Sequence, residues 1–316
     1  MKSTNKLICL MLFSCFIGAC TKNAENPECP DNGNEIFKDD CVPIPNPPEF
    51  FQQWPMVTPD VVINLTADVN PENNDQFCIL QQLGPGNEQI IIYTRSTNQV
   101  EILLQGDFSP KINWMVDEWI IFKEADNSTI QRIKSDGSQI EDVFEGASSQ
   151  IKRNFDHTKL LCQNNYITYI VEGTTVLDTI DYNFPSDGNW DHPAGKLLFP
   201  NLYDIGIHQF LEEEADNLLI ESNERIDDVY WCDSFTRLIW LSREGWFKTN
   251  PTTLESKQIR ENCDAKSYRF HAHIDDQILV TCFYKEPYIG DTLLSTGRVG
   301  LVKCDGSSID FFDIPQ

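Results

Sequence analysis

The feature that most constrains this chain is a β-rich cassette that recurs about every 40 residues. One apolar run of each cassette is easy to recognise: FCIL at 77–80, WIIF at 119–122, KLLC at 159–162, KLLF at 196–199, RLIW at 237–240 and QILV at 277–280. From position 119 onward the starts are separated by 40, 37, 41 and 40 residues. Four short strands in each unit of this length are typical of a β-propeller blade. We therefore predict an all-β fold, a six-bladed β-propeller of four-stranded antiparallel blades.

Turn signals separate the predicted strands. An aromatic residue and a tight turn precede most of the apolar runs, as in 114–117, 155–157, 190–193, 231–233 and 270–273. Asp136-Gly137 is a strong hairpin signal because both central positions of such a turn favour positive φ, and Asp305-Gly306 repeats it in the last unit. This pattern resembles the repeat of TolB-type and WD40-like (PD40-type) bacterial propellers. The resemblance implies blades around a central channel, with the repeated aromatics wedged between adjacent blades.

The way the ring closes is open at this stage. In one arrangement residues 61–65 form the innermost strand of the first blade, the last blade ends at 309–312, and the ring closes by packing alone. In the other arrangement the N-terminal segment adds an outer strand to the last blade. We prefer the first. A pair of β-sandwiches is the rival fold, but it does not explain the regular period.

The N-terminus predicts export and lipidation. Residues 1–19 have a basic start and an apolar core, as in a secretory signal, and are too short to span a membrane. The sequence around Cys20 resembles the lipobox of bacterial lipoproteins, which implies cleavage before Cys20 and acyl chains, including palmitate, on that residue. Thr21 and Lys22 in place of an aspartate favour the outer membrane, at its periplasmic or surface face. We predict a signal peptide at 1–19, a lipidated tether at 20–58 and a propeller at 59–316.

The tether is rich in Pro and Asn, which is typical of a semi-rigid spacer. Cys29 and Cys41 flank a short loop, and in an oxidising compartment we predict a disulfide between them. The acids of that loop lack EF-hand spacing, so calcium is the weaker interpretation. Cys78 and Cys162 lie inside predicted strands and are interpreted as buried free thiols.

The net charge of −25 argues against nucleic acid as a partner. A surface with 49 acids and 24 bases repels phosphate backbones and offers no counterion release. The membrane is therefore expected to be reached through the lipid on Cys20.

Four of the five histidines, including His157, lie near the turn after an innermost strand. Equivalent turns of a ring converge at one mouth of its channel, so His192, His271 and His273 are weak candidates for a divalent-metal site. The competing interpretation is that these side chains only satisfy turns or the core. No nucleophile elbow, zinc-protease motif or phosphate-binding loop is present, and we assign no catalytic residue and no firm cofactor.

The preferred functional interpretation is a membrane-anchored extracytoplasmic lipoprotein that binds or scaffolds. Its propeller would bind a protein, a peptide or a glycan. The alternative is a metal-dependent hydrolase or lyase that acts on carbohydrate or peptide at the channel mouth. A structural role in envelope assembly is a further interpretation, by analogy with TolB-like folds alone.

Overall fold

The computed structural model describes residues 37–38, 62–84, 86–146, 150–164, 166–181, 188–209, 217–262, 266–286 and 293–315. The chain divides into two units, residues 1–34 and 35–316, and all described residues lie in the second. The predicted signal peptide, the lipidation site Cys20 and the Cys29–Cys41 pair lie outside the described residues. Among the described residues no helix has the length and apolarity needed to cross a membrane.

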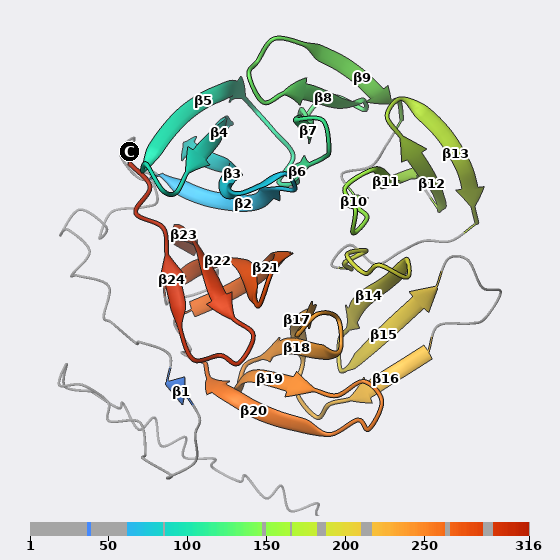
Figure 1. Ribbon diagram of the computed structural model, residues 1–316, viewed down its shortest axis with the longest axis vertical. Helices are drawn as coiled ribbons and strands as arrows, with labels where there is room; N and C mark the ends of the chain where they lie inside the picture. Colours follow the sequence, from blue (N-terminus) through green and yellow to red (C-terminus); the bar gives the residue numbers. More distant parts are fainter. Residues whose placement is uncertain are drawn as a thin grey trace, which may run out of the picture. The chain divides into compact units, whose positions relative to one another are not determined.

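The second unit is built from strands in sequence order around a common centre (Figure 1). The first three groups of strands are β2 (Ile63–Asn70), β3 (Asn73–Gly84), β4 (Asn87–Thr94) and β5 (Gln99–Gly106); β6 (Asn113–Trp114), β7 (Trp119–Lys123), β8 (Ile130–Lys134) and β9 (Ile140–Phe144); and β10 (Ile151–Arg153), β11 (Lys159–Asn164), β12 (Ile167–Glu172) and β13 (Thr175–Ile180). The others are β14 (Lys196–Asn201), β15 (Asp204–Gln209) and β16 (Asn217–Glu221); β17 (Ile226–Cys232), β18 (Arg237–Ser242), β19 (Gly245–Thr249) and β20 (Ser256–Glu261); and β21 (Lys266–Ile274), β22 (Gln277–Glu286), β23 (Leu293–Lys303) and β24 (Ile309–Phe311).

Within each group, consecutive strands pair antiparallel. The strands β2, β6, β10, β17 and β21 lie nearest the centre (Figure 1). The six apolar runs found in the sequence are all in the second strand of a group or, for residues 196–199, in β14. The prediction of an all-β fold with four-stranded antiparallel sheets is confirmed, although among the described residues β14–β16 form a sheet of three strands, with an isolated bridge from Asn189 to Leu198.

The apolar runs are continuous because both faces of the second strand are covered. In β3, Cys78 and Leu80 pack with Trp114 and Ile120 of the β6–β9 group, while Phe77 and Ile79 face the β21–β24 group. Trp114 is fully buried, as expected for an aromatic wedged between neighbouring sheets. Phe155 departs from that expectation, because its side chain is 41% exposed.

The predicted Asp-Gly turns join the last two strands of their groups. Gly137 has φ 73° and its N–H donates to the carbonyl of Lys134 over 2.8 Å, while the Asp136 carboxylate accepts the Ser138 N–H. The turn at Asp305-Gly306 repeats the same contacts. Only the glycine takes the left-handed conformation, so the expected positive φ at both central positions is wrong.

Ring closure follows the first arrangement in its strand order. The β2 strand is innermost in its group, and β24 pairs with β23 of its own group. Closure by packing alone is wrong, because β2 pairs in parallel with β23 at Ile63 and Gly297, and the Asn64 side-chain amide donates to the Gly297 carbonyl over 2.7 Å. A Cβ at position 297 would lie 2.2 Å from the Asn64 carbonyl oxygen, so this close approach requires glycine.

Two further features tie sequence-distant segments together. The short strand β1 (Phe37–Lys38), which lies inside the predicted tether, pairs in parallel with the outer edge of β20. A disulfide joins Cys232, at the end of β17, to Cys304 after β23, across 72 residues. The sequence had named no partner for either cysteine. Cys78 and Cys162 are buried free thiols, as predicted.

Candidate functional site

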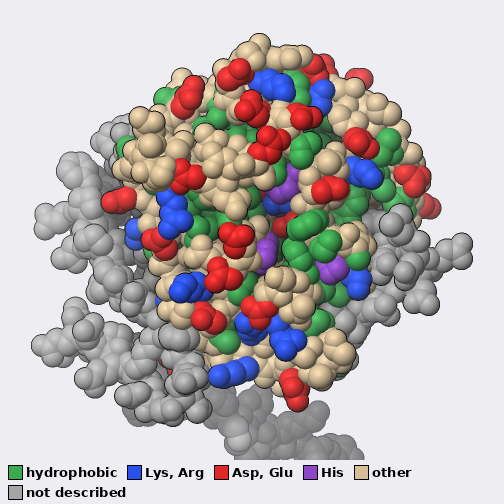
Figure 2. Space-filling model, in the orientation of Figure 1, with side chains coloured by type: hydrophobic (Ala, Val, Ile, Leu, Met, Phe, Trp, Pro, Cys, Tyr) green, Lys and Arg blue, Asp and Glu red, His purple; other side chains and the backbone are tan. Residues whose placement is uncertain are grey.

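Histidine side chains lie near the middle of the face in Figure 2, among hydrophobic side chains, while carboxylates are spread more widely over that face. Two of the histidines of the predicted site, His192 and His273, both contact the Phe235 ring. The contacts of the histidines decide which of them serve the fold and which line a surface that a ligand can reach.

His157 and His271 serve the fold. The buried His157 ring contacts the Trp114 carbonyl through Nδ1 at 2.5 Å, so this nitrogen carries the proton and donates. His271 lies between two hydroxyls, with Nε2 2.7 Å from Thr281 Oγ1 and Nδ1 3.4 Å from Thr66 Oγ1. Burial, together with the smaller effect of nearby cations, first Lys111, lowers the pKa of His271 to about 3. The ring is neutral at pH 7.

His192 and His273 flank a phenylalanine that sequence analysis did not single out. Phe235 lies between them, with ring centroids 5.5 Å from His192 and 5.1 Å from His273. It also meets Phe155, edge to face, at 5.0 Å. We call these four residues the Phe235 cluster. Phe155 therefore contacts a turn residue of a non-adjacent group and is not wedged between neighbouring sheets.

The three predicted metal ligands do not form a ligand set in the described part of the chain. Phe235 separates His192 from His273, and the threonine hydroxyls occupy both nitrogens of His271. A register shift between Phe270 and Ala272 also breaks the simple alternation that would place His271 and His273 on one face. The one group of metal-type ligand atoms among the described residues is Cys232, Asp233 and Cys304, and its two sulfurs form the disulfide. The residues present do not fit the predicted divalent-metal centre.

The turn that carries Phe235 is strained. Asp233, Ser234 and Phe235 have φ values of 47°, 51° and 66°, three consecutive left-handed residues of which none is glycine. Each such residue costs on the order of 1–2 kcal/mol. The turn is held by the Thr236 hydroxyl, which donates to the Asp233 carbonyl over 2.7 Å, and by an ion pair between Lys248 and Asp233 at 2.6 Å. Retained strain of this kind is found at functional sites more often than elsewhere.

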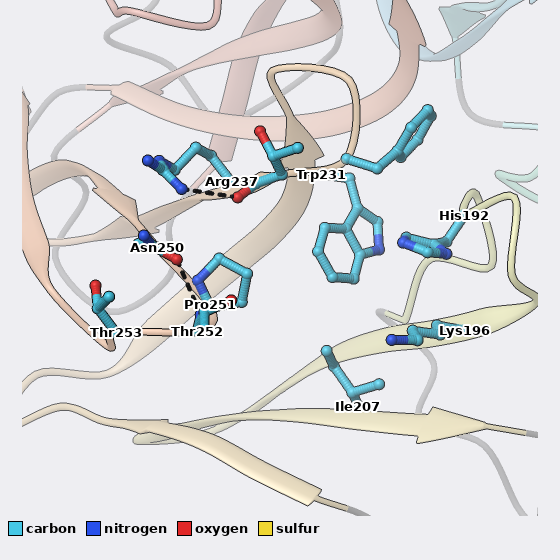
Figure 3. A pocket seen from close by; sticks show the side chains of 11 residues that line it. His192, Lys196, Ile207, Trp231, Arg237, Asn250, Pro251, Thr252 and Thr253 are labelled. Atoms are coloured by element: carbon cyan, nitrogen blue, oxygen red, sulfur yellow. Dashed lines mark hydrogen bonds between the residues drawn. The ribbon is translucent and has the colours of Figure 1, made fainter.

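A pocket of about 600 Å³ opens beside this turn, between the β14–β16 and β17–β20 groups (Figure 3). Its apolar lining comes from Ile207, Trp231, Phe235 and Pro251. Its polar lining comes from His192, Lys196, Thr236, Arg237, Asn250, Thr252 and Thr253. Among the described residues, the lining thus holds two cations and no carboxylate, in a chain where acids outnumber bases by 49 to 24.

The pocket presents mainly hydrogen-bond donors at neutral pH. His192 Nδ1 accepts the Ala194 N–H over 3.0 Å, so its proton is on Nε2. Burial lowers the pKa of His192 to about 4, and the Lys196 charge acts in the same direction. Among the described residues, neither Lys196 nor Arg237 forms an ion pair, and the buried Trp231 Nε1 has no acceptor. The Trp231 indole lies against His192, with ring centroids 4.6 Å apart.

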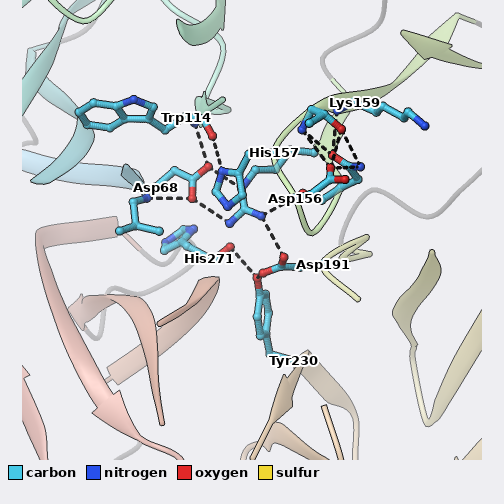
Figure 4. Close-up of polar contacts among 12 residues, drawn as sticks. Asp68, Trp114, Asp156, His157, Lys159, Asp191, Tyr230 and His271 are labelled. Atoms are coloured by element: carbon cyan, nitrogen blue, oxygen red, sulfur yellow. Dashed lines mark hydrogen bonds and ion pairs between the residues drawn. The ribbon is translucent and has the colours of Figure 1, made fainter. Parts of the chain in front are cut away.

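A second cationic centre lies in the middle of the ring (Figure 4). Arg153 of β10 is 5% exposed and donates to both oxygens of Asp68 from β2, over 2.8 and 3.0 Å. Its third nitrogen donates to Asp191 over 3.0 Å. Asp191 accepts the Tyr230 hydroxyl, which also contacts the His271 carbonyl at 3.0 Å. Asp68, Arg153, Asp191 and Tyr230 form what we call the central network.

The central network is structural because it saturates its own charges. Burial alone would lower the pKa of Arg153, but the charges of Asp191 and Asp68 raise it well above its ordinary value. Asp68 also accepts the backbone N–H groups of Val69 and Trp114, each at 2.9 Å. The innermost strands of non-adjacent groups are thereby joined across the ring.

A repeated clasp between adjacent innermost strands supports this assignment. The Asp228 carboxylate of β17 accepts the Val229 N–H over 2.8 Å and the Phe270 N–H of β21 over 2.7 Å. Asp68 makes the same two contacts between β2 and β6. Burial raises the pKa of Asp228 to about 7. Its burial and its role as a clasp make it a part of the fold rather than a candidate catalytic acid.

Three comparisons place these findings among known proteins. No protein-family model matches the chain, and no curated protein matches it in sequence. A solved structure of a putative TolB from Agrobacterium tumefaciens is similar, with a TM-score of 0.54 and 15% identity, over 71% of this chain and 87% of that one. Kluyveromyces lactis Hsv2 aligns with a TM-score of 0.46 and 12% identity, over 72% and 76% of the two chains. The C-terminal WD40 domain of Sif2 aligns with a TM-score of 0.44 and 12% identity, over 79% and 70%. The likeness to the putative TolB, at 15% identity, shows the fold, a TolB-like β-propeller.

Proposed function

We propose that this protein is a membrane-anchored extracytoplasmic lipoprotein whose propeller binds a protein, peptide or glycan partner. The acyl chains on Cys20 would hold it at the outer membrane, and residues 20–58 would space the propeller from the lipid surface. The propeller would have six blades. This count takes the eight-stranded sheet as two blades, β2–β5 and β21–β24, which a single parallel pair joins.

The observation that carries the proposal is the contrast between the pocket and its surroundings. Buried polar groups near the centre, such as Arg153 and Asp228, are engaged by other parts of the fold. The pocket, in contrast, presents Lys196 and Arg237 without ion-pair partners among the described residues, beside apolar walls. A concave site with apolar walls and a few directed polar groups is suited to binding.

The test compares anchored and unanchored protein in cells. The wild type, Cys20→Ala and the double variant Lys196→Met/Arg237→Gln would be crosslinked in intact cells and extracted in detergent. Lipidation of Cys20 would be checked by mass spectrometry of the N-terminal peptide. We expect acyl chains on Cys20, and a crosslinked partner that Cys20→Ala and the double variant both lose. An unmodified Cys20 would overturn the anchor. Crosslinking that is unchanged in the double variant would overturn the pocket as the binding site.

A further inference from the structure

We propose that the pocket between the β14–β16 and β17–β20 groups binds a sugar ring that carries a carboxylate, such as the uronic acid unit of an acidic glycan. This inference rests on the proposed binding function and names the chemical class of the ligand. It is carried by three features of the pocket: its charge, its wall and its size.

The charge selects an anion. Lys196 and Arg237 both line the pocket, and the Arg237 guanidinium makes one hydrogen bond there, from Nη1 to the Thr236 carbonyl over 3.1 Å. Most donors of that guanidinium are therefore available for a bidentate contact with a carboxylate. His192 adds an Nε2–H. The described residues of the lining include no carboxylate, so a cationic ligand would find no counter-charge among them, whereas an anionic ligand would find Lys196 and Arg237.

The walls select a ring with hydroxyls. Ile207 and Pro251 give apolar surfaces on which the C–H face of a sugar can pack (Figure 3). The Thr236 and Thr253 hydroxyls donate to the Asp233 carbonyl and the Glu255 carboxylate, so toward a sugar they act as acceptors, and Thr252 adds a third hydroxyl to the lining. The turn around Asn250 is fixed, because Asn250 Oδ1 accepts the Thr252 N–H over 2.9 Å and its carbonyl accepts the Leu254 N–H over 2.8 Å. The Thr252 and Thr253 hydroxyls are therefore presented from a hydrogen-bonded turn.

The size selects a short unit. A pocket of about 600 Å³ is within the range of roughly 300–1,000 Å³ for small-ligand sites. It suits one or two sugar rings. An extended peptide that adds a strand needs a free sheet edge, whereas this pocket is lined by side chains from two groups and their turns.

The test titrates the full-length protein with D-glucuronate, with D-glucose as the neutral ring and with N-acetyl-triglutamate as the acidic peptide, by calorimetry and saturation-transfer NMR. We expect glucuronate to bind, and glucose to bind at least about tenfold more weakly because it lacks the charge-assisted bonds. Lys196→Met and Arg237→Gln should each weaken glucuronate binding by about tenfold. The control is Arg243→Gln, an exposed arginine outside the pocket, which should leave it unchanged.

Each remaining outcome overturns the inference. Equal binding of glucose and glucuronate would show that the pocket does not recognise the carboxylate. Tighter binding of N-acetyl-triglutamate would replace the sugar by an acidic peptide. Absence of glucuronate binding would show that the ligand class is wrong. Binding that Lys196→Met and Arg237→Gln do not affect would show that the site is wrong. A crosslinked cellular partner that the double variant loses would still support the broader binding function in all of these cases.

Discussion

Arg153 and Arg237 show two uses of the same side chain in one acidic protein. Arg153 is 5% exposed and donates to two carboxylates, so its charge is neutralised by the fold. Arg237 lines the pocket and donates only to a neighbouring carbonyl. Both arginines lie at a strand end, Arg153 as the last residue of β10 and Arg237 as the first residue of β18, close after the turn of three left-handed residues.

This difference teaches which charges are available for function. A buried cation that is fully paired stabilises one arrangement of the strands around it, and its removal leaves uncompensated carboxylates. A half-buried cation without an ion-pair partner contributes little to stability, so it can be used in binding. Stability and binding should therefore respond to different substitutions, and the following experiments are arranged to separate them.

The largest effect is expected at the central network. Arg153→Met would leave the buried carboxylates of Asp68 and Asp191 without their cation. Breaking a buried ion pair by removing one partner costs about 3–5 kcal/mol of unfolding free energy. The matched substitution Arg237→Met should cost less than about 0.5 kcal/mol. Urea denaturation monitored by tryptophan fluorescence measures both, and similar losses in the two variants would contradict the comparison.

The disulfide supports the region of the pocket rather than the centre. Cys232 directly precedes the strained turn, and its bond to Cys304 closes a chain separation of 72 residues. The double variant Cys232→Ser/Cys304→Ser should lose about 2–4 kcal/mol of unfolding free energy. Reductant should destabilise the wild type by a similar amount and leave the double variant unchanged. A wild type that is insensitive to reductant under denaturing conditions would show that this bond does not form.

The pH dependence of stability tests the contribution of a buried group of the fold, His271. Burial lowers the pKa of His271 to about 3 from its ordinary value of 6.5, so the unfolded chain takes up the proton first as the pH falls. The stability that neutral His271 contributes is therefore present above pH 6.5 and is lost as the pH falls towards 3. As the pH falls from 7 to 5, this one group lowers the free energy of unfolding by about 2 kcal/mol.

The variant His271→Gln should remove this part of the pH dependence. Asp228, with a pKa raised to about 7 by burial, acts in the opposite direction, because its contribution is lost as the pH rises through that value. His192, with its pKa lowered to about 4, acts in the same direction as His271. Both residues remain in the variant, so the difference between the two pH profiles isolates His271. Identical profiles from pH 7 to pH 5 would show that the ring is not held neutral.

Much of the fold could be predicted from the sequence, because a 40-residue period and the Asp-Gly turns are local signals. The second strands at 77–80 and 237–240, the turn at Asp305-Gly306 and the buried Cys78 are all confirmed. The site was harder to predict because it depends on contacts between residues distant in sequence. Asp68 and Arg153 are 85 positions apart, and a charged residue in a strand that reads Ile-Lys-Arg gives no sign of burial.

The histidines illustrate the same limit. Their positions after innermost strands brought His192 and His273 to the same phenylalanine but gave no sign of the partners of any of them. His271 is held by Thr66 and Thr281, and Phe235 lies between His192 and His273. The sequence did not indicate that Phe235 lies in a turn, because bulky residues rarely adopt positive φ. The run of polar residues around it, Cys-Asp-Ser-Phe-Thr, indicated a turn and no more.

The smallest effect concerns the strained turn itself. Ser234 is exposed and has φ 51°, a conformation that glycine adopts without steric cost. In Ser234→Gly the relief of strain exceeds the added freedom of the unfolded chain only slightly, so the unfolding free energy should rise by less than about 1 kcal/mol. Ser138, also exposed but with ordinary φ, is the matched control, and Ser138→Gly should lower the unfolding free energy by about 0.5–1 kcal/mol.

If the turn positions Phe235 for binding, Ser234→Gly should also weaken the binding of glucuronate although it makes the fold more stable. A variant that gains stability and binds glucuronate as well as the wild type would show that the strained turn does not serve binding.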